Sequence, residues 1–340
     1  MKLGAYIIRR LLLLIPVLLG VSVFIFTLTR VGGDPAAAYI HEKMTDDQIA
    51  RIYEKFHLND PIYVQYWYWL DGILHGDWGY SKTARAPVTT AIARYLPATF
   101  ELTLISIIIA VSVGIGLGTI SAVRRNKPVD HATRIMALSG VSLPIFWLGL
   151  MLQLVFYSRL RWFPAGGRYD ELLYLSQGSI TKYTGFWTLD TLLNGNLTLF
   201  ADALWHLILP AITLSFGTIA IITRIMRSSM LEVLGQEYVK TARSKGLPEK
   251  VVIKKHARKN ALIPTTTVVG LSFGGLLGGA VLTETIFQWP GMGQWSTRAI
   301  ITNDWASILG FVLVTAIIYV IANLVVDILY AFLDPRVRLG

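Results

Sequence analysis

Six long apolar runs constrain this chain more than any other feature of its sequence. A helix of about 20 apolar residues is long enough to cross a hydrocarbon layer about 30 Å thick. Only 15% of the residues are charged, against about 25% in soluble domains. The sequence therefore predicts an all-α polytopic membrane protein, with spans at Tyr6–Thr29, Thr99–Val123, Ile135–Tyr157, Trp205–Met226, Ile263–Phe287 and Ser307–Tyr330.

The first apolar run has some features of a secretory signal. Lys2, Arg9 and Arg10 precede it, and Ala36-Ala37-Ala38 has the small residues of a cleavage site. The run is longer than the roughly 7–15 residues of a signal peptide core. We expect an uncleaved first membrane helix.

Lysine and arginine predict the orientation of the spans. An even number of spans places both termini on one side, and the loops of that side are rich in basic residues. The positive-inside rule makes this side the cytoplasm. The net charge of +10 thus reflects membrane topology, and we expect no nucleic-acid partner. The basic residues concerned are Arg9, Arg10, Arg124, Arg125, Lys127, Arg227, Lys240, Arg243, Lys245, Lys250, Lys254, Lys255, Arg258, Lys259, Arg336 and Arg338.

Three loops are expected outside, over residues 30–97, 159–204 and 288–306. The first contains a predicted helix at Asp46–His57 with Thr45 as its N-cap. It also carries the aromatic residues Tyr63, Tyr66, Trp67, Tyr68 and Trp69. Amphipathic aromatics favour the membrane interface, so we interpret this cluster as an anchor in preference to a ligand platform.

Small residues and one proline mark the expected packing inside the membrane. Gly270, Gly274 and Gly278 recur every four residues in the fifth span and predict close approach of another helix. The second span repeats the pattern with Gly114, Gly116 and Gly118. Pro144 removes a backbone hydrogen bond in the third span and predicts a kink there.

Several kinds of chemistry have no support in the sequence. It contains no GxxxxGK[ST] phosphate loop, no HExxH zinc motif and no cysteine. Gly140-Val141-Ser142 resembles a serine nucleophile, but no general base accompanies it, and helix packing explains the pair better. We therefore expect no catalytic, cofactor-binding or metal-binding residue in this chain.

Ionisable residues within spans are costly and often functional. Glu101, His206 and Glu284 lie near outer span ends, and Arg224 and Asp327 lie near inner ends, where most are expected to extend toward the interface. No span centre carries a carboxylate or a lysine, which disfavours an ion-coupled carrier. A transporter with neither a coupling-ion site nor an ATP site must obtain its energy from a partner.

The loop between the fourth and fifth spans is basic, and residues 237–264 read EYVKTARSKGLPEKVVIKKHARKNALIP. An ordinary cytoplasmic loop obeying the positive-inside rule explains the charge alone. The small residues Ala242 and Gly246, one helical turn apart, instead favour a docking site for a soluble partner.

Distinctive segments follow one another along the whole chain. They are YIIRRLLLLIPVLLGVSVFIFTL, GGDP (32–35), HGDWGYS (75–81), SLPIFWLG (142–149), TARSKG (241–246), HARKNALIP (256–264), LTETIFQWPGMGQW (282–295) and DPRVR (334–338). In their order and spacing they resemble the membrane subunit of a bacterial or archaeal ABC importer, in particular the B-type permease of the dipeptide, oligopeptide and nickel systems. The general EAA-xxx-G loop motif of importers lacks its glutamate and first alanine here, but the TARAKG form of peptide permeases matches Thr241–Gly246 except at Ser244.

The resemblance implies a type I importer permease fold. Residues 1–97 would form the first helix and a long external loop, 98–331 the permease core, and 332–340 a cytoplasmic tail. It implies a coupling helix before Gly246, seated on an ATPase, within a loop at about 227–262. The residues expected in ATPase coupling are Glu237, Thr241, Ala242, Arg243, Lys245, Gly246, His256 and Arg258.

The resemblance also implies partners: a second homologous permease subunit, two ABC ATPases that bind ATP and magnesium, and an extracellular or periplasmic substrate-binding protein. Membrane lipid surrounds the assembly. Peptides are the expected cargo, and oligosaccharides are the alternative, because the aromatic outer loops suit both. An ion-coupled carrier and a non-transport membrane scaffold are the alternatives of other classes.

Overall fold

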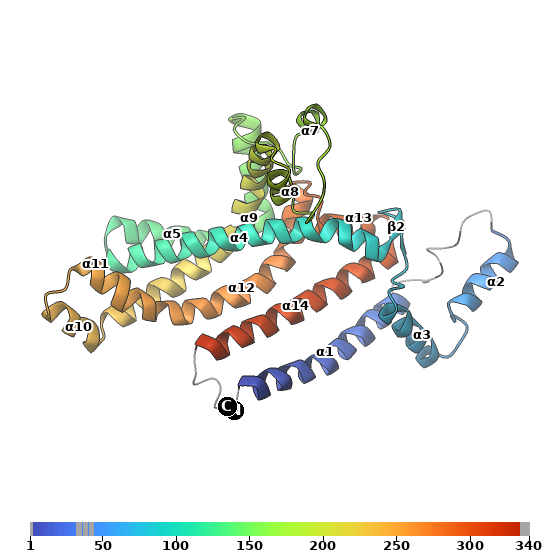
Figure 1. The fold of residues 1–340 in the computed structure, drawn as a ribbon, viewed down its shortest axis with the longest axis horizontal. Helices are drawn as coiled ribbons and strands as arrows, with labels where there is room; N and C mark the ends of the chain where they lie inside the picture. Colours follow the sequence, from blue (N-terminus) through green and yellow to red (C-terminus); the bar gives the residue numbers. More distant parts are fainter. Residues whose placement is uncertain (1–2, 32–35, 37–39, 41–43, 334–340) are drawn as a thin grey trace.

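The computed structural model describes residues 3–31, 36, 40 and 44–333. Long helices dominate this part of the chain and lie roughly alongside one another (Figure 1). Among these residues, five helices are individually long and apolar enough to cross a membrane, and a bent helix pair is a sixth candidate if its two halves form one span. The crossings are α1 (Leu3–Val31), α4 (Val88–Val123), α5 (Pro128–Ser142) with α6 (Ile145–Leu152), α9 (Leu197–Leu234), α12 (Arg258–Ile286) and α14 (Trp305–Leu333).

All six predicted spans are confirmed as helical, but the crossing helices are longer than the apolar runs. α4 begins at Val88 instead of Thr99, and α9 extends beyond both ends of Trp205–Met226. Hydropathy reports where lipid ends, whereas a helix continues into water as long as its neighbours support it. The motifs at 32–35 and 334–338, and most of the predicted tail, lie outside the described residues.

Shorter elements connect these helices. At one end of the bundle lie α2 (Asp46–Lys55), α3 (Ile62–Leu74), the antiparallel pair β1 (Tyr80–Ser81) and β2 (Ala86–Pro87), and α13 (Met292–Ile301). At the other end lie α10 (Glu237–Ser244), α11 (Glu249–Val251) and the π-helix η3 (Val252–Ala257), together with the start of α1 and the end of α14 (Figure 1). The remaining elements are the π-helix η2 (Gln153–Arg159), α7 (Glu171–Gln177) and α8 (Trp187–Leu193).

The connection between α1 and α4 folds as its sequence indicates. α2 begins after Thr45, whose backbone N–H donates to Gln48 Oε1 at 3.0 Å. α3 carries the aromatic cluster, and its Tyr66 packs edge-on against Phe26 of α1, with its hydroxyl 2.8 Å from Ser22. Trp67 remains 70% exposed, which fits an anchor at the membrane interface.

The third crossing is broken, and the predicted kink understates it. The chain bends by 111° between α5 and the helix formed by α6 and η2, across Leu143 and Pro144. Leu143 has an extended backbone (ψ 130°), as expected for a residue that precedes proline. Pro144 then serves as the N-cap of α6.

The most extensive helix packing joins α4 to α9. A Cβ at Gly114 would lie 2.7 Å from Ile222, and one at Gly118 would lie 2.7 Å from Met226. Gly140 brings α5 equally close to α9, because a Cβ there would lie 2.6 Å from Ala220. This contact supports the packing interpretation of Gly140-Val141-Ser142.

Only part of the predicted glycine face of α12 packs against another helix among the described residues. Gly274 packs against Tyr319 of α14, with 2.9 Å between a built Cβ and the ring. Gly278 has no neighbour within 4 Å of such a Cβ among those residues, and Gly270 is half-buried. The hydrophobic core forms where α4, α9 and α12 meet, around Leu102, Leu214 and Leu276, and Trp289 closes its outer end.

Candidate functional site

Two regions carry the candidate functional residues: the basic end around α10 and an open cavity at the opposite ends of α6 and α12, beside α13. We call it the outer cavity after the predicted orientation. At the basic end, α10 has a buried face and an exposed face. Val239 and Ala242 pack against Val252 of η3 in a small core. Ala242 is therefore buried against this chain, so its small size serves packing within the chain, and its part in coupling to a partner stays a prediction.

Gly246 ends α10 through its backbone conformation. Its φ is +75°, a left-handed value that glycine adopts without strain. Its N–H donates to the Arg243 carbonyl at 2.9 Å, and Leu247 N–H donates to the Ala242 carbonyl at 3.4 Å. Nothing in the described chain lies within 4 Å of a Cβ built at Gly246, so the turn and not close packing requires glycine.

An ion pair closes the turn that follows α10. Arg243 donates from Nη2 and Nε to the two carboxylate oxygens of Glu249, at 2.7 and 3.1 Å. These hydrogen bonds hold the pKa of Glu249 below its usual range. The chain thus presents a rigid helix and turn at its basic end.

The structure brings most of the predicted coupling residues onto one exposed surface. Glu237, Thr241, Arg243, Lys245 and Gly246 are all exposed there, and Glu237 pairs with Lys240 at 2.7 Å. His256 and Arg258 lie separately, on η3 and at the start of α12. In the described part of the chain, neither of these two side chains makes a hydrogen bond or an ion pair.

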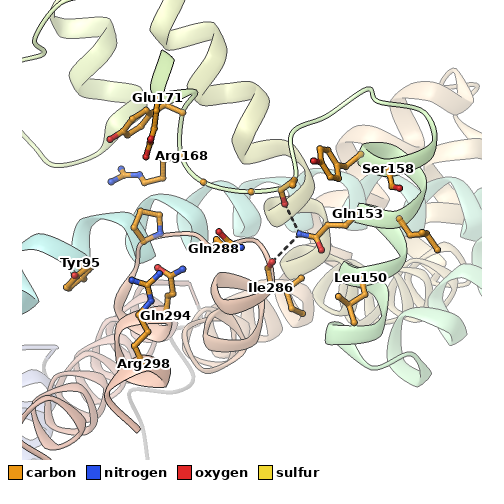
Figure 2. A pocket seen from close by; sticks show the side chains of 17 residues that line it. Tyr95, Leu150, Gln153, Ser158, Arg168, Glu171, Ile286, Gln288, Gln294 and Arg298 are labelled. Carbon is orange, nitrogen blue, oxygen red and sulfur yellow. Dashed lines mark hydrogen bonds between the residues drawn. The ribbon is translucent and has the colours of Figure 1, made fainter. Parts of the chain in front are cut away.

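The outer cavity has a volume of about 820 Å³. η2, α13, the α12–α13 turn and the segment at residues 165–171 surround it (Figure 2). Gln153 of η2 ties these walls together, donating through Nε2 to the carbonyls of Ala165 (2.6 Å) and Ile286 (3.1 Å). Gly166 permits this closure because a Cβ there would lie 2.0 Å from the Phe287 carbonyl oxygen.

Charged and amide groups line the cavity from opposite sides. Figure 2 shows Arg168 and Glu171 on one wall and Gln294 and Arg298 across from them. Glu171 and Arg298 are exposed, and among the described residues neither forms an ion pair. The cavity therefore offers a free carboxylate and a free guanidinium to a ligand.

Glu101 and Arg168 form a buried ion pair behind the cavity wall. Glu101 is 2% exposed and also accepts from Thr188 N–H and Oγ1, both at 2.7 Å. Arg168 donates to the Gly185 carbonyl at 3.0 Å and lies over the Trp289 ring. The expectation that Glu101 extends toward the interface is wrong, because residues about 70 to 90 positions later in the chain surround it.

Glu284 is also fully buried, so the same expectation fails there. One oxygen accepts from Thr99 Oγ1 at 2.6 Å, and the other accepts from the N–H groups of Gly293 and Gln294 at 2.7 and 3.1 Å. These amides belong to the first turn of α13, where a carboxylate is favourable. Gly291 and Gly293 make room for it, since a Cβ at either would lie within 3 Å of its oxygens.

His206, the third such residue, is 8% exposed and contacts Asp202 one turn earlier, with 3.2 Å between Nδ1 and Oδ1. Arg224 is exposed on α9.

Two family models together match almost the whole chain. Residues 3–103 match the N-terminal model of the membrane component of binding-protein-dependent transport systems. Residues 114–339 match the model of the binding-protein-dependent transport system inner membrane component.

Curated relatives align over nearly their full lengths. The chain is 44% identical to the probable D,D-dipeptide transport system permease protein DdpB of Escherichia coli, covering 96% of this chain and 95% of that protein. It is also 44% identical to the dipeptide transport system permease protein DppB of Alkalihalophilus pseudofirmus, covering 98% and 99%. The oligopeptide transport system permease protein AppB of Bacillus subtilis is 38% identical, covering 98% and 99%.

Proposed function

The chain belongs to the inner membrane component family of binding-protein-dependent transport systems, and from this we propose that it forms half of the translocation pathway of an ATP-driven importer of short peptides. It is a multi-pass permease of the cell membrane. The three relatives reported above are named for dipeptide or oligopeptide transport, which favours peptides over oligosaccharides.

The outer cavity is the observation that carries the peptide proposal. A free peptide has an ammonium group at one end and a carboxylate at the other. Glu171 suits the first and Arg298 the second, while Gln288 and Gln294 suit the amide bonds between them. Neutral oligosaccharides have no need of opposed charges.

Uptake into proteoliposomes tests this function directly. The chain is reconstituted with the second permease subunit, two ATPase subunits and the substrate-binding protein. We expect ATP-dependent accumulation of a labelled dipeptide and no accumulation of a labelled oligosaccharide. Uptake of the oligosaccharide alone, or dipeptide uptake without the ATPase subunits, would overturn the proposal.

We further propose that α10 is the coupling helix and that ATP and magnesium bind only to the partner ATPases. The exposed face of α10 and the turn at Gly246 form the surface available to them. The buried face fixes α10 to η3, and η3 continues into α12. A displacement of α10 is therefore transmitted to α12, one of the cavity walls.

Topology is the first prediction. With no native cysteine, single cysteines label unambiguously. We expect Ser244→Cys to react only from the cytoplasmic side, because it lies at the basic end. Leu175→Cys, at a 75% exposed position of α7, is expected to react only from outside. The reverse pattern contradicts the proposed orientation.

Gly246→Trp is the second prediction. An L-residue at φ +75° is strained by about 1 kcal/mol or more, and a bulky side chain blocks the exposed turn. We expect the variant to fold but to lose most substrate-stimulated ATP hydrolysis in the reconstituted importer. Gly246→Asn is the matched control, since asparagine tolerates left-handed backbone and should retain most of the stimulation. Full stimulation in Gly246→Trp rules out the coupling role.

A further inference from the structure

A second cavity, of about 570 Å³, lies between α5 and α9, well away from the outer cavity. Arg134 and Arg224 line it from the two helices. Both are exposed, and neither makes an ion pair or side-chain hydrogen bond with any residue that the structure describes. A third arginine, Arg227, also lines it but is bound in a bidentate pair to Asp130.

The charges at this cavity are one-sided. Among the described residues that line it, none carries a carboxylate. Asp130 lies outside the lining, is fully buried and is occupied by Arg227, Ser121 and the Asn126 N–H. Two guanidinium groups thus lie without a carboxylate beside the apolar side chains of Ile135, Leu138 and Val141, where an uncompensated charge is costly.

A buried hydroxyl points to the same ligand chemistry. Thr223 is 1% exposed, lines the cavity directly before Arg224 in the α9 sequence, and its Oγ1 has no hydrogen-bond partner in the described chain. Buried hydroxyl groups are usually bonded, so this one indicates a missing acceptor or water.

The position along the helices indicates where the ligand comes from. Arg134 directly precedes the predicted span that begins at Ile135, and Arg224 lies two residues before Met226, where the fourth predicted span ends. Both cations are therefore at the edge of the hydrocarbon layer. Beyond them toward the apolar interior, Leu138 and Val141 of the same cavity are 70% and 54% exposed.

We propose that this α5–α9 cavity binds an anionic phospholipid, with its phosphate between Arg134 and Arg224 and an acyl chain along Leu138 and Val141. A phosphodiester accepts bidentate hydrogen bonds from guanidinium groups and one more from the Thr223 hydroxyl. Basic pockets between membrane helices suit such headgroups. The apolar wall distinguishes this site from one for free phosphate.

Lipid retention tests the site. The full-length chain is reconstituted in nanodiscs of phosphatidylcholine doped with phosphatidylglycerol. It is then released under mild conditions, and native mass spectrometry measures the lipids that stay bound. We expect preferential retention of phosphatidylglycerol by the wild type. Arg134→Gln combined with Arg224→Gln should lower this enrichment by about tenfold or more. Thr223→Val, which has a similar shape, should lower it by a smaller factor, about threefold.

Matched variants distinguish lipid binding in this cavity from general electrostatic attraction of anionic lipid to basic residues. Arg124→Gln with Arg125→Gln removes the same charge at the same end of the helices but outside the cavity, and should leave the enrichment unchanged. An equal loss in that control, or full retention in the cavity variant, overturns the proposal. A third outcome also overturns the proposal: the cavity variant co-purifies less of the second permease subunit but keeps its lipid enrichment. The α5–α9 cavity would then be a subunit interface.

Discussion

Arg168→Ala is expected to destabilise the subunit by about 3–5 kcal/mol, because it leaves Glu101 as a buried carboxylate without its cation. The pair joins α4 to the segment that forms one wall of the outer cavity. Its loss should therefore release residues 165–190 from the bundle before the bundle itself unfolds. A lower midpoint in thermal size-exclusion assays and faster proteolysis within that segment are the expected measurements.

Two variants make this prediction specific. Arg159→Ala removes an exposed arginine of η2, just before the same segment, and should change the midpoint little. Glu101→Gln combined with Arg168→Met removes both charges and should recover much of the loss. If Arg168→Ala unfolds no earlier than Arg159→Ala, the ion pair does not hold the wall in place.

The second large effect is expected at Glu284. Glu284→Ala leaves Thr99 Oγ1 and the amides of Gly293 and Gln294 buried without their acceptor. Each unsatisfied donor costs about 1–3 kcal/mol, so we expect little folded subunit to accumulate in the membrane. Glu284→Gln retains an acceptor oxygen and should show an intermediate loss.

Glycine variants check the same interaction from the other side. Gly291→Ala would place a Cβ 2.4 Å from Glu284 Oε1, so we expect it to reproduce much of the Glu284→Ala defect. Gly275→Ala is the control, because nothing in the described chain lies within 4 Å of a Cβ there. Normal accumulation of Gly291→Ala would show that α13 tolerates displacement of the carboxylate.

The sequence predicted those features that depend on local pattern. Apolar length identified the six crossings, and Thr45 identified the start of α2. The coupling turn was predictable to the residue because Gly246 follows a short amphipathic helix. Orientation and coupling themselves stay predictions.

The features that sequence reasoning missed depend on partners far along the chain. Glu101 and Glu284 read as interfacial because each lies near a span end, but Arg168 and the first turn of α13 enclose them. PGMG (290–293), before and within α13, was the sequence signal that could have indicated the buried position of Glu284, since paired glycines often make room for a neighbouring group. Glycine spacing likewise predicted closer packing of α12 than the described residues show. The spacing identifies a helix face without side chains, but it does not identify the helix that contacts this face.

The break at Pro144 has a mechanical consequence. α5 is fastened to α9 through Gly140, whereas η2, beyond the break, is fastened through Gln153 to the end of α12. The first half of this crossing thus packs on α9, whereas the second half contacts both α9, where Gly149 lies against Thr213, and the end of α12. A shift of α12 relative to α9 would pull on η2 through Gln153, and the break at Leu143 and Pro144 would let η2 follow while α5 stays against α9. The mouth of the outer cavity would then change shape without disturbing the α5–α9 cavity.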